Sequence, residues 1–201
     1  CEDGSMFGEE YTLVAVSDFV LSKNPGNTVS NLSSTRALRD VTIKHNGSYV
    51  ASAVGEVNVV EKMKETNAII GGEGNGGIIY PELHYGRDAL VGIALFLTQL
   101  AERKISAKTL RDSYPNYFIS KNKIQLTTEI DVDNILSTLE EKYNEEQITT
   151  IDGLKIDFED GWVHLRKSNT EPIIRIYAES EGEEKANGFA EKMINEIKEL
   201  I

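Results

Sequence analysis

The pattern of hydrophobic residues changes partway along the chain, and this change constrains the fold more than any other feature. Before about residue 104, short apolar runs typical of strands alternate with longer periodic segments typical of helices. Such alternation indicates a sheet covered by helices on both faces. After that point the predicted strands follow one another closely. We therefore expect an α/β domain with a mixed sheet, followed by a smaller α+β domain.

The first zone has clear signals for its individual elements. We expect helices at 9–23, 57–64 and 87–103, and strands at 28–32, 49–54 and 68–70. A further helix contains Ala37, Leu38 and Val41, with Ser33 or Ser34 as its predicted N-cap. The dipeptide Asn46-Gly47 predicts its end.

The second zone reads as strand, helix, three strands and helix. The predicted strands are at 123–129, 154–158, 162–166 and 173–178, with a hairpin turn at Asp160-Gly161. Asp131 or Asp133 is the expected cap of the first helix, and apolar residues at i, i+3 and i+4 spacing mark the C-terminal one. This order predicts an antiparallel sheet with helices on one face.

Charge and cysteine content narrow the classes of function. The 201 residues include 33 acidic and 21 basic side chains, a formal net charge of -12. This balance argues against general nucleic-acid binding and against docking on anionic membranes. The single cysteine, Cys1, leaves no internal disulfide framework and fits a reducing cytoplasm. The longest apolar stretch, 89–97, is far shorter than a membrane span. Because the chain begins without Met, we interpret it as a fragment.

The first chemically distinctive segment is the glycine-rich loop 71–77, which follows a predicted buried strand. Glu73 can accept two hydroxyl hydrogen bonds and Asn75 can both donate and accept, so the pair suits a sugar. Residues 72–77 also match the G-x-G-x-x-G pattern of dinucleotide sites. The Glu73 carboxylate would repel a pyrophosphate, and residues 78–81 do not resemble a helix start. A plain glycine-rich connection with an exposed Glu is the alternative.

The second distinctive segment is the loop 166–172, between two predicted strands. Arg166, Lys167 and Arg175 form a local cluster of cations in a strongly acidic chain. Arginine guanidinium groups, hydroxyl groups and turn amides together suit a phosphate. The alternative is a polar turn with exposed charges.

Four segments in the same order resemble the α-D-phosphohexomutase family, and together they cover most of the chain. Residues 72–77 resemble the sugar-binding loop of that family, and residues 166–172 resemble its C-terminal phosphate-binding loop. Residues 86–89 match the segment after the sugar loop, and residues 54–63 resemble the glycine-turn segment of the third domain. The resemblance implies the third and fourth of four domains, the last being TBP-like. We expect these domains at 1–112, whose first few residues trail from the second domain, and at 113–201.

The resemblance also implies roles for individual residues. The sugar loop would consist of Glu73, Gly74, Asn75 and Gly76, and the phosphate loop of Arg166, Ser168, Asn169, Thr170 and Arg175. Glu56 and Arg87 are secondary candidates. Arg87 and Asp88 would stabilise the loop and the start of the next helix, with His84 at the surface.

The activity implied by the resemblance is transfer of a phosphoryl group between C1 and C6 of a hexose, in the isomerase class. The phosphoserine and metal loops of the family have no counterpart here, so the fragment alone is expected to be inactive. Magnesium would bind outside this chain, and Asp131-Val132-Asp133 is assigned no metal. The expected partners are a phosphosugar, a hexose 1,6-bisphosphate intermediate and the missing N-terminal domains, in the cytoplasm.

Three alternatives remain open from the residues. One is a non-catalytic module that binds phosphosugars, and another is a nucleotide-dependent dehydrogenase based on the glycine pattern. The third concerns the substrate. Many family members have Gly-His where this chain has Gly55-Glu56, and Glu56 would favour an amino sugar electrostatically.

Overall fold

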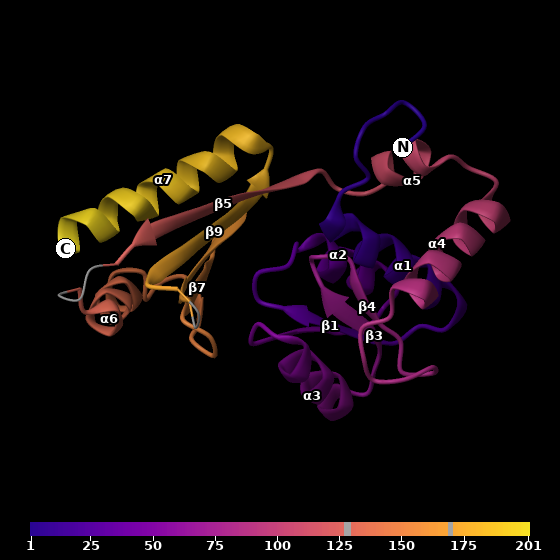
Figure 1. The fold of residues 1–201 in the computed structure, drawn as a ribbon, viewed down its shortest axis with the longest axis horizontal. Helices are drawn as coiled ribbons and strands as arrows, with labels where there is room; N and C mark the ends of the chain where they lie inside the picture. Colours follow the sequence, from indigo (N-terminus) through magenta and orange to yellow (C-terminus); the bar gives the residue numbers. More distant parts are fainter. Residues whose placement is uncertain (127–129, 169–170) are drawn as a thin grey trace. The chain divides into compact units, whose positions relative to one another are not determined.

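The computed structural model describes residues 1–126, 130–168 and 171–201. It divides into two compact units, residues 1–115 and 116–201 (Figure 1). Within the described residues, no helix is both long enough and apolar enough to cross a membrane.

A mixed sheet forms the centre of the first unit. Its strand order is β2 (Tyr49–Ser52), β1 (Asn27–Asn31), β3 (Ala68–Glu73) and β4 (Gly77–Ile79). β1 is parallel to both β2 and β3, whereas β4 is antiparallel to β3. The α/β fold with a mixed sheet expected from the sequence is confirmed.

Helices cover both faces of this sheet. They are α1 (Glu9–Lys23), α2 (Ala37–Lys44), α3 (Glu56–Thr66), α4 (Ala89–Arg103) and α5 (Ala107–Asp112). Neighbouring residues of a strand point to opposite faces. In β3, Gly71 faces Met63 of α3, whereas Gly72 faces Leu13 of α1. The unit therefore has three layers, with α1 and α3 on opposite sides of the sheet (Figure 1).

One expectation for the first unit was wrong, and one predicted strand is longer than expected. Helix α2 begins at Ala37 after Arg36, with no side-chain cap, so neither Ser33 nor Ser34 is its N-cap. The Ser34 hydroxyl instead accepts a hydrogen bond from the Gly74 amide, because this loop packs against the glycine loop. Strand β3 continues past residue 70 as far as Glu73. Glycines suit this strand since a Cβ on Gly71 would lie 2.6 Å from the Val29 carbonyl oxygen.

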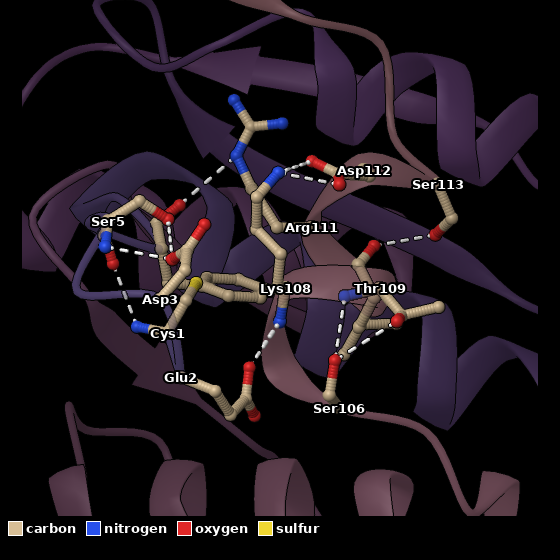
Figure 2. Close-up of polar contacts among 12 residues, drawn as sticks. Cys1, Glu2, Asp3, Ser5, Ser106, Lys108, Thr109, Arg111, Asp112 and Ser113 are labelled. Atoms are coloured by element: carbon tan, nitrogen blue, oxygen red, sulfur yellow. Dashed lines mark hydrogen bonds and ion pairs between the residues drawn. The ribbon is translucent and has the colours of Figure 1, made fainter.

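The first residues of the chain form hydrogen bonds with helix α5 (Figure 2). The Glu2 carboxylate accepts hydrogen bonds from the amides of Ala107 (2.7 Å) and Lys108 (3.0 Å), which supply free donors at the helix N-terminus. The Arg111 guanidinium donates to the Phe7 carbonyl oxygen at 3.1 Å. These hydrogen bonds hold the first residues of the unit beside α5, the last helix of the same unit.

The second unit is an antiparallel sheet with helices on one face. Its strand order is β5 (Tyr117–Gln125), β9 (Ile173–Glu181), β8 (Gly161–Lys167), β7 (Leu154–Asp157) and β6 (Gln147–Thr149). Apolar side chains of these strands pack with those of α6 (Val132–Lys142) and α7 (Glu183–Leu200) to form the core. The expected α+β architecture is confirmed, as is Asp131 as the cap of α6, since its side chain accepts from the Asn134 amide.

The two edge strands of this sheet differ from expectation. β6 was not predicted, because three residues are too few for an alternating pattern. β5 begins at Tyr117 rather than at residue 123, and its exposed and buried positions alternate along a polar sequence. The predicted end of that strand, residues 127–129, lies outside the described residues. Edge strands with polar and charged side chains carry weak hydrophobic signals.

Candidate functional site

The glycine loop is the turn between β3 and β4, and Glu73 is its most constrained member. Only 7% of Glu73 is exposed. Its Oε1 accepts hydrogen bonds from Asn31 Nδ2 (2.8 Å) and from the Gly55 amide (3.3 Å). Its Oε2 lies 3.5 Å from a guanidinium nitrogen of Arg87. The carboxylate is therefore held in one position. Oε1 accepts two hydrogen bonds, whereas Oε2 has only the longer contact with Arg87 among the described residues.

The rest of the loop is a tight hairpin. The Gly74 amide donates to Ser34 Oγ at 2.9 Å, and Asn75 Oδ1 accepts from the Gly77 amide at 3.1 Å. Gly76 has φ +81°, a conformation that favours glycine. The loop leads into strand β4 rather than into a helix, unlike the phosphate loop of a dinucleotide fold. The structure thus brings Glu73, Gly74, Asn75 and Gly76 together in one turn, in which Glu73 and Gly74 are buried and Asn75 is exposed.

Residues that support this loop were missed by the sequence analysis. Asn31 is the last residue of β1, Ser34 lies in the segment after that strand, and Glu10 lies on α1. A Cβ on Gly74 would lie 1.9 Å from a carboxylate oxygen of Glu10, so only glycine fits there without a shift. The polar residues at and after the end of β1 could have indicated these supports. The carboxyl ends of neighbouring parallel strands lie at the same edge of a sheet, so residues there can contact the glycine loop after β3.

Glu56 and Arg87 form a hydrogen-bonded ion pair next to the glycine loop. Glu56 Oε1 accepts from the Arg87 backbone amide at 3.1 Å, and Oε2 accepts from Arg87 Nε at 2.8 Å. These hydrogen bonds, first from the amide and then from the side chain, lower the pKa of Glu56. Arg87 also approaches Glu73, so one guanidinium links two carboxylates of the glycine loop and α3.

Asp88 connects this region to α4. Its side chain accepts from the amides of Leu90 (2.8 Å) and Val91 (3.0 Å), which makes it the N-cap of that helix. The Val91 amide, followed by the His84 side chain, lowers the pKa of Asp88. His84 is half exposed, with its Nε2 3.1 Å from Asp88. Both residues therefore stabilise the turn into α4.

The second candidate site lies where β8 turns into β9. Arg166 of β8 is directly opposite Arg175 of β9. Their strand neighbours Leu165 and Ile174 belong to the core beneath the helices, so the two arginines belong to the other face of the sheet. The Ser168 amide donates to the Ile173 carbonyl oxygen at 3.0 Å. Asn169 and Thr170, also predicted here, lie outside the described residues.

The two arginines form an unusual electrostatic arrangement. Like charges directly opposite each other on neighbouring strands destabilise a sheet. The Nε atoms of Arg166 and Arg175 are buried, and neither has a hydrogen-bond partner among the described residues. One terminal nitrogen of Arg175 donates to Glu171 at 3.2 Å. An oxyanion between the two guanidinium groups would satisfy the buried donors and offset the repulsion.

The described residues do not fit a magnesium site. No group of three or more His, Cys, Asp or Glu side chains among them is close enough to hold a metal ion. Asp131 is engaged as the cap of α6, and Asp133 lies 3.6 Å from Lys167.

Two family models match the chain in succession. Residues 8–117 match the α/β/α domain III of phosphoglucomutase/phosphomannomutase, and residues 123–196 match the C-terminal domain of the same family. The chain is 36% identical over 184 residues to a phosphoglucosamine/phosphogalactosamine mutase of Sulfurisphaera tokodaii, covering 89% of this chain and 40% of that relative. It is also 36% identical over 203 residues to a phosphoglucomutase/phosphomannomutase of Thermococcus kodakarensis, covering 100% of this chain and 44% of the relative.

Solved structures agree with this fold. A phosphoglucomutase/phosphomannomutase family protein from Burkholderia thailandensis superposes with a TM-score of 0.80 at 24% identity, over 98% of this chain and 43% of that one. An Aspergillus fumigatus N-acetylphosphoglucosamine mutase, solved with glucose 1,6-bisphosphate, superposes with a TM-score of 0.66 at 14% identity, over 96% and 43%. The chain spans less than half the length of these proteins. The predicted resemblance is confirmed: the chain belongs to the phosphoglucomutase/phosphomannomutase family and carries its domain III and its C-terminal domain.

Proposed function

We propose that this chain is the substrate-positioning part of a phosphohexomutase that interconverts hexose 1-phosphates and 6-phosphates. The observation that carries the proposal is the pair formed by Arg166 and Arg175, two opposed arginines whose buried Nε donors have no hydrogen-bond partner within residues 1–126, 130–168 and 171–201. In a chain of net charge -12, such a pair is a local exception that suits a phosphate. The names of the relatives from Sulfurisphaera tokodaii and Thermococcus kodakarensis support the same chemistry.

The two loops would contribute different parts of substrate binding. Arg166 and Arg175, with Ser168, Asn169 and Thr170, would hold the phosphate that does not react. Glu73 Oε2 and the Asn75 amide would bind ring hydroxyls, since Glu73 Oε1 is already occupied by Asn31 and Gly55. Gly74 and Gly76 would allow the backbone to approach the ring. Because phosphoryl transfer depends on positioning and charge stabilisation, such contacts contribute directly to rate.

The reacting groups would come from outside these 201 residues. The proposal assigns the phosphoserine and the magnesium ligands to preceding domains of a longer polypeptide, with a hexose 1,6-bisphosphate as the intermediate. An Aspergillus fumigatus N-acetylphosphoglucosamine mutase with a similar fold was solved with GlcNAc-6P and magnesium, which supports a phosphosugar substrate and a magnesium ion for the complete enzyme. The proposed location is the cytoplasm, consistent with a single cysteine.

Glu56 bears on which hexose is preferred. Both of its carboxylate oxygens accept hydrogen bonds from Arg87, so the ammonium group of an amino sugar would compete with Arg87 for them. If Glu56 selects an amino sugar, Glu56→Ala in a full-length enzyme should reduce turnover of glucosamine phosphate more than that of glucose or mannose phosphate. Equal losses on all three substrates would contradict this selection.

Calorimetric titration of the 201-residue chain tests the phosphate site. Arg166→Ala should weaken binding of glucose 6-phosphate by about 1.5–3 kcal/mol, typical of a charge-assisted contact. Lys185→Ala is the matched control, because it removes one positive charge from α7, on the helix-covered side of the same unit. Glu73→Gln should weaken glucose 6-phosphate binding but leave inorganic phosphate binding unchanged. Unchanged binding in Arg166→Ala would refute the phosphate assignment.

A non-catalytic phosphosugar-binding module is the second candidate, favoured by the absence of a metal cluster among the residues that the structure describes. The two candidates differ in what precedes residue 1. A longer polypeptide with mutase activity that is lost in Arg166→Ala supports the enzyme. Binding without activity in the complete protein supports the module.

A further inference from the structure

We propose that the outward face of α4 is the surface on which the preceding domain of the full-length polypeptide docks. The exposed side chains of this face are Leu90, Ile93, Ala94, Leu97 and Ala101, and we call it the α4 stripe. Their spacing of i, i+3, i+4, i+7 and i+11 places them on one side of a helix with 3.6 residues per turn. Leu90 is 78% exposed, Ile93 56% and Leu97 57%.

The α4 stripe is anomalous for a water-exposed helix. Residues 89–101 contain no charged side chain. The opposite side of the helix, which includes the buried Gly92 and Gln99, already faces the first unit. A helix that is apolar all round is normally buried on all sides. With 15 residues and a rise of about 1.5 Å per residue, α4 is too short for the roughly 30 Å of a membrane core. A protein surface is therefore the fitting partner.

The start of the chain lies on the same helix. The Phe7 ring packs edge-on against Phe96 of α4, with centroids 5.0 Å apart and planes at 85°. Met6, next to it, is 87% exposed. Glu2 accepts hydrogen bonds from amides of α5, the helix that directly follows α4 (Figure 2). Any polypeptide preceding residue 1 would therefore join the first unit beside α5, which directly follows the helix that carries the α4 stripe.

Size and length favour the preceding domain over a second copy of the chain. The relatives with which this chain shares 36% identity have more than half of their length outside the matched part. Burying one large aliphatic side chain removes roughly 60–120 Å² from water, so the three large residues supply about 200–350 Å². A stable dimer needs about 800 Å² per partner, whereas interfaces between domains of one chain begin near 300 Å² per side.

The inference rests on the proposed function only in assuming that preceding domains exist. It is tested by cysteine labelling in a Cys1→Ser background, which removes the one natural thiol. Ile93→Cys probes the α4 stripe. Ile43→Cys is the matched control, since Ile43 is 60% exposed near the end of α2. Each variant is made in the 201-residue chain and in the longer polypeptide, and the rate of maleimide labelling is measured under native conditions.

The expected result is fast labelling of both sites in the 201-residue chain. In the longer polypeptide, Ile93→Cys should label at least about tenfold more slowly, equivalent to about 1.4 kcal/mol of protection, and Ile43→Cys should be unchanged. Equal labelling of Ile93→Cys in both polypeptides would overturn the inference. So would protection in the 201-residue chain that rises with concentration alongside a dimer in light scattering. A gene without upstream domains would overturn it as well.

A parallel measurement separates this inference from the proposed function. Glucose 6-phosphate binding to the 201-residue Ile93→Cys chain should match that of the parent, because α4 and the phosphate loop belong to different units. If Ile93→Cys labels equally fast in both polypeptides while glucose 6-phosphate still binds, the docking surface is rejected and the proposed function is not. Absent phosphate binding in the parent chain would reject the proposed function alone.

Discussion

Replacing Asp18 should destabilise the first unit more than replacing any exposed carboxylate. Asp18 lies on α1 and is only 2% exposed. Its carboxylate contacts His45 Nε2 at 2.8 Å, Arg103 at 2.8 Å and Tyr114 Oη at 3.0 Å, with Gln99 Nε2 at 3.4 Å. It therefore joins α1 to the end of α2, to α4 and to the segment before the boundary between the units.

The size of the effect follows from what each substitution leaves behind. Asp18→Ala leaves the Tyr114 hydroxyl buried without its acceptor and Arg103 without its counterion. Breaking a fully buried charge pair costs about 3–5 kcal/mol, and a hydrogen bond to a charged group contributes about 1.5–3 kcal/mol. Because the Arg103 side chain is 34% exposed and water can solvate it, we expect a loss of about 2–4 kcal/mol for Asp18→Ala and somewhat less for Asp18→Asn. Since a domain has about 5–15 kcal/mol of stability, the loss is large.

The network also predicts a dependence on pH. Burial by itself would raise the pKa of Asp18, but hydrogen bonding from His45, the charge of Arg103 and hydrogen bonding from Tyr114 outweigh it and lower the pKa. A lowered pKa adds stability above the unfolded value of about 3.9, and this stability is lost as pH falls through the folded value. The parent chain should lose this contribution below about pH 4, whereas Asp18→Asn should lack it.

Urea unfolding followed by circular dichroism measures both effects, and hydrogen exchange of the α1 and α4 amides locates them. Asp112→Asn is the matched control, because Asp112 is 58% exposed and paired only at the surface with Lys108. That control should change stability by about 0.5 kcal/mol or less. An Asp18→Asn variant as stable as Asp112→Asn, with the same pH dependence, would refute the reasoning.

Two further predictions concern the glycine loop and the second unit. Gly74→Ala should destabilise the first unit because its Cβ would meet the Glu10 carboxylate at 1.9 Å, and Gly74→Ala with Glu10→Ala should lose less than the sum of the two single changes in a double-mutant cycle. Additive losses would contradict that contact. Burial lowers the pKa of His164 to about 4, so stability should fall as pH decreases from about 6.5 towards 4, by roughly 2–4 kcal/mol. His164→Gln should flatten this slope in urea titrations, and an NMR titration giving a pKa near 6.5 for His164 would refute the prediction.

Elements with strong local patterns were predictable from sequence. Periodic apolar residues indicated α1, α4 and α7, and Asp160-Gly161 indicated the hairpin between β7 and β8. Short or polar elements were not: β6 has three residues, and β5 is a polar edge strand. The mistaken cap at Ser33 or Ser34 has the same origin, since the Ser34 hydroxyl contacts Gly74, forty residues away.

In the candidate site, too, residues within one loop were predictable, whereas their contacts with residues far away in the sequence were not. The residue types of the glycine loop and of Arg166 and Arg175 were sufficient to predict a sugar-reading and a phosphate-binding segment, both of which remain proposals. Their partners were not predictable. Glu73 is held by Asn31, which lies 42 positions earlier, and Glu56 is paired with Arg87, 31 positions later. Such pairs form only where the carboxyl ends of neighbouring strands converge.

The two fold classes and most helices could be read from the sequence alone. These depend on signals within a few residues, such as periodicity, turns and caps. Three features depend on how distant segments pack: the occupied oxygen of Glu73, the pairing of Arg166 with Arg175, and the contacts by which Asp18 joins four segments. Those pairings depend on strand register and on packing between distant segments, where a shift of one residue would turn each strand side chain to the opposite face.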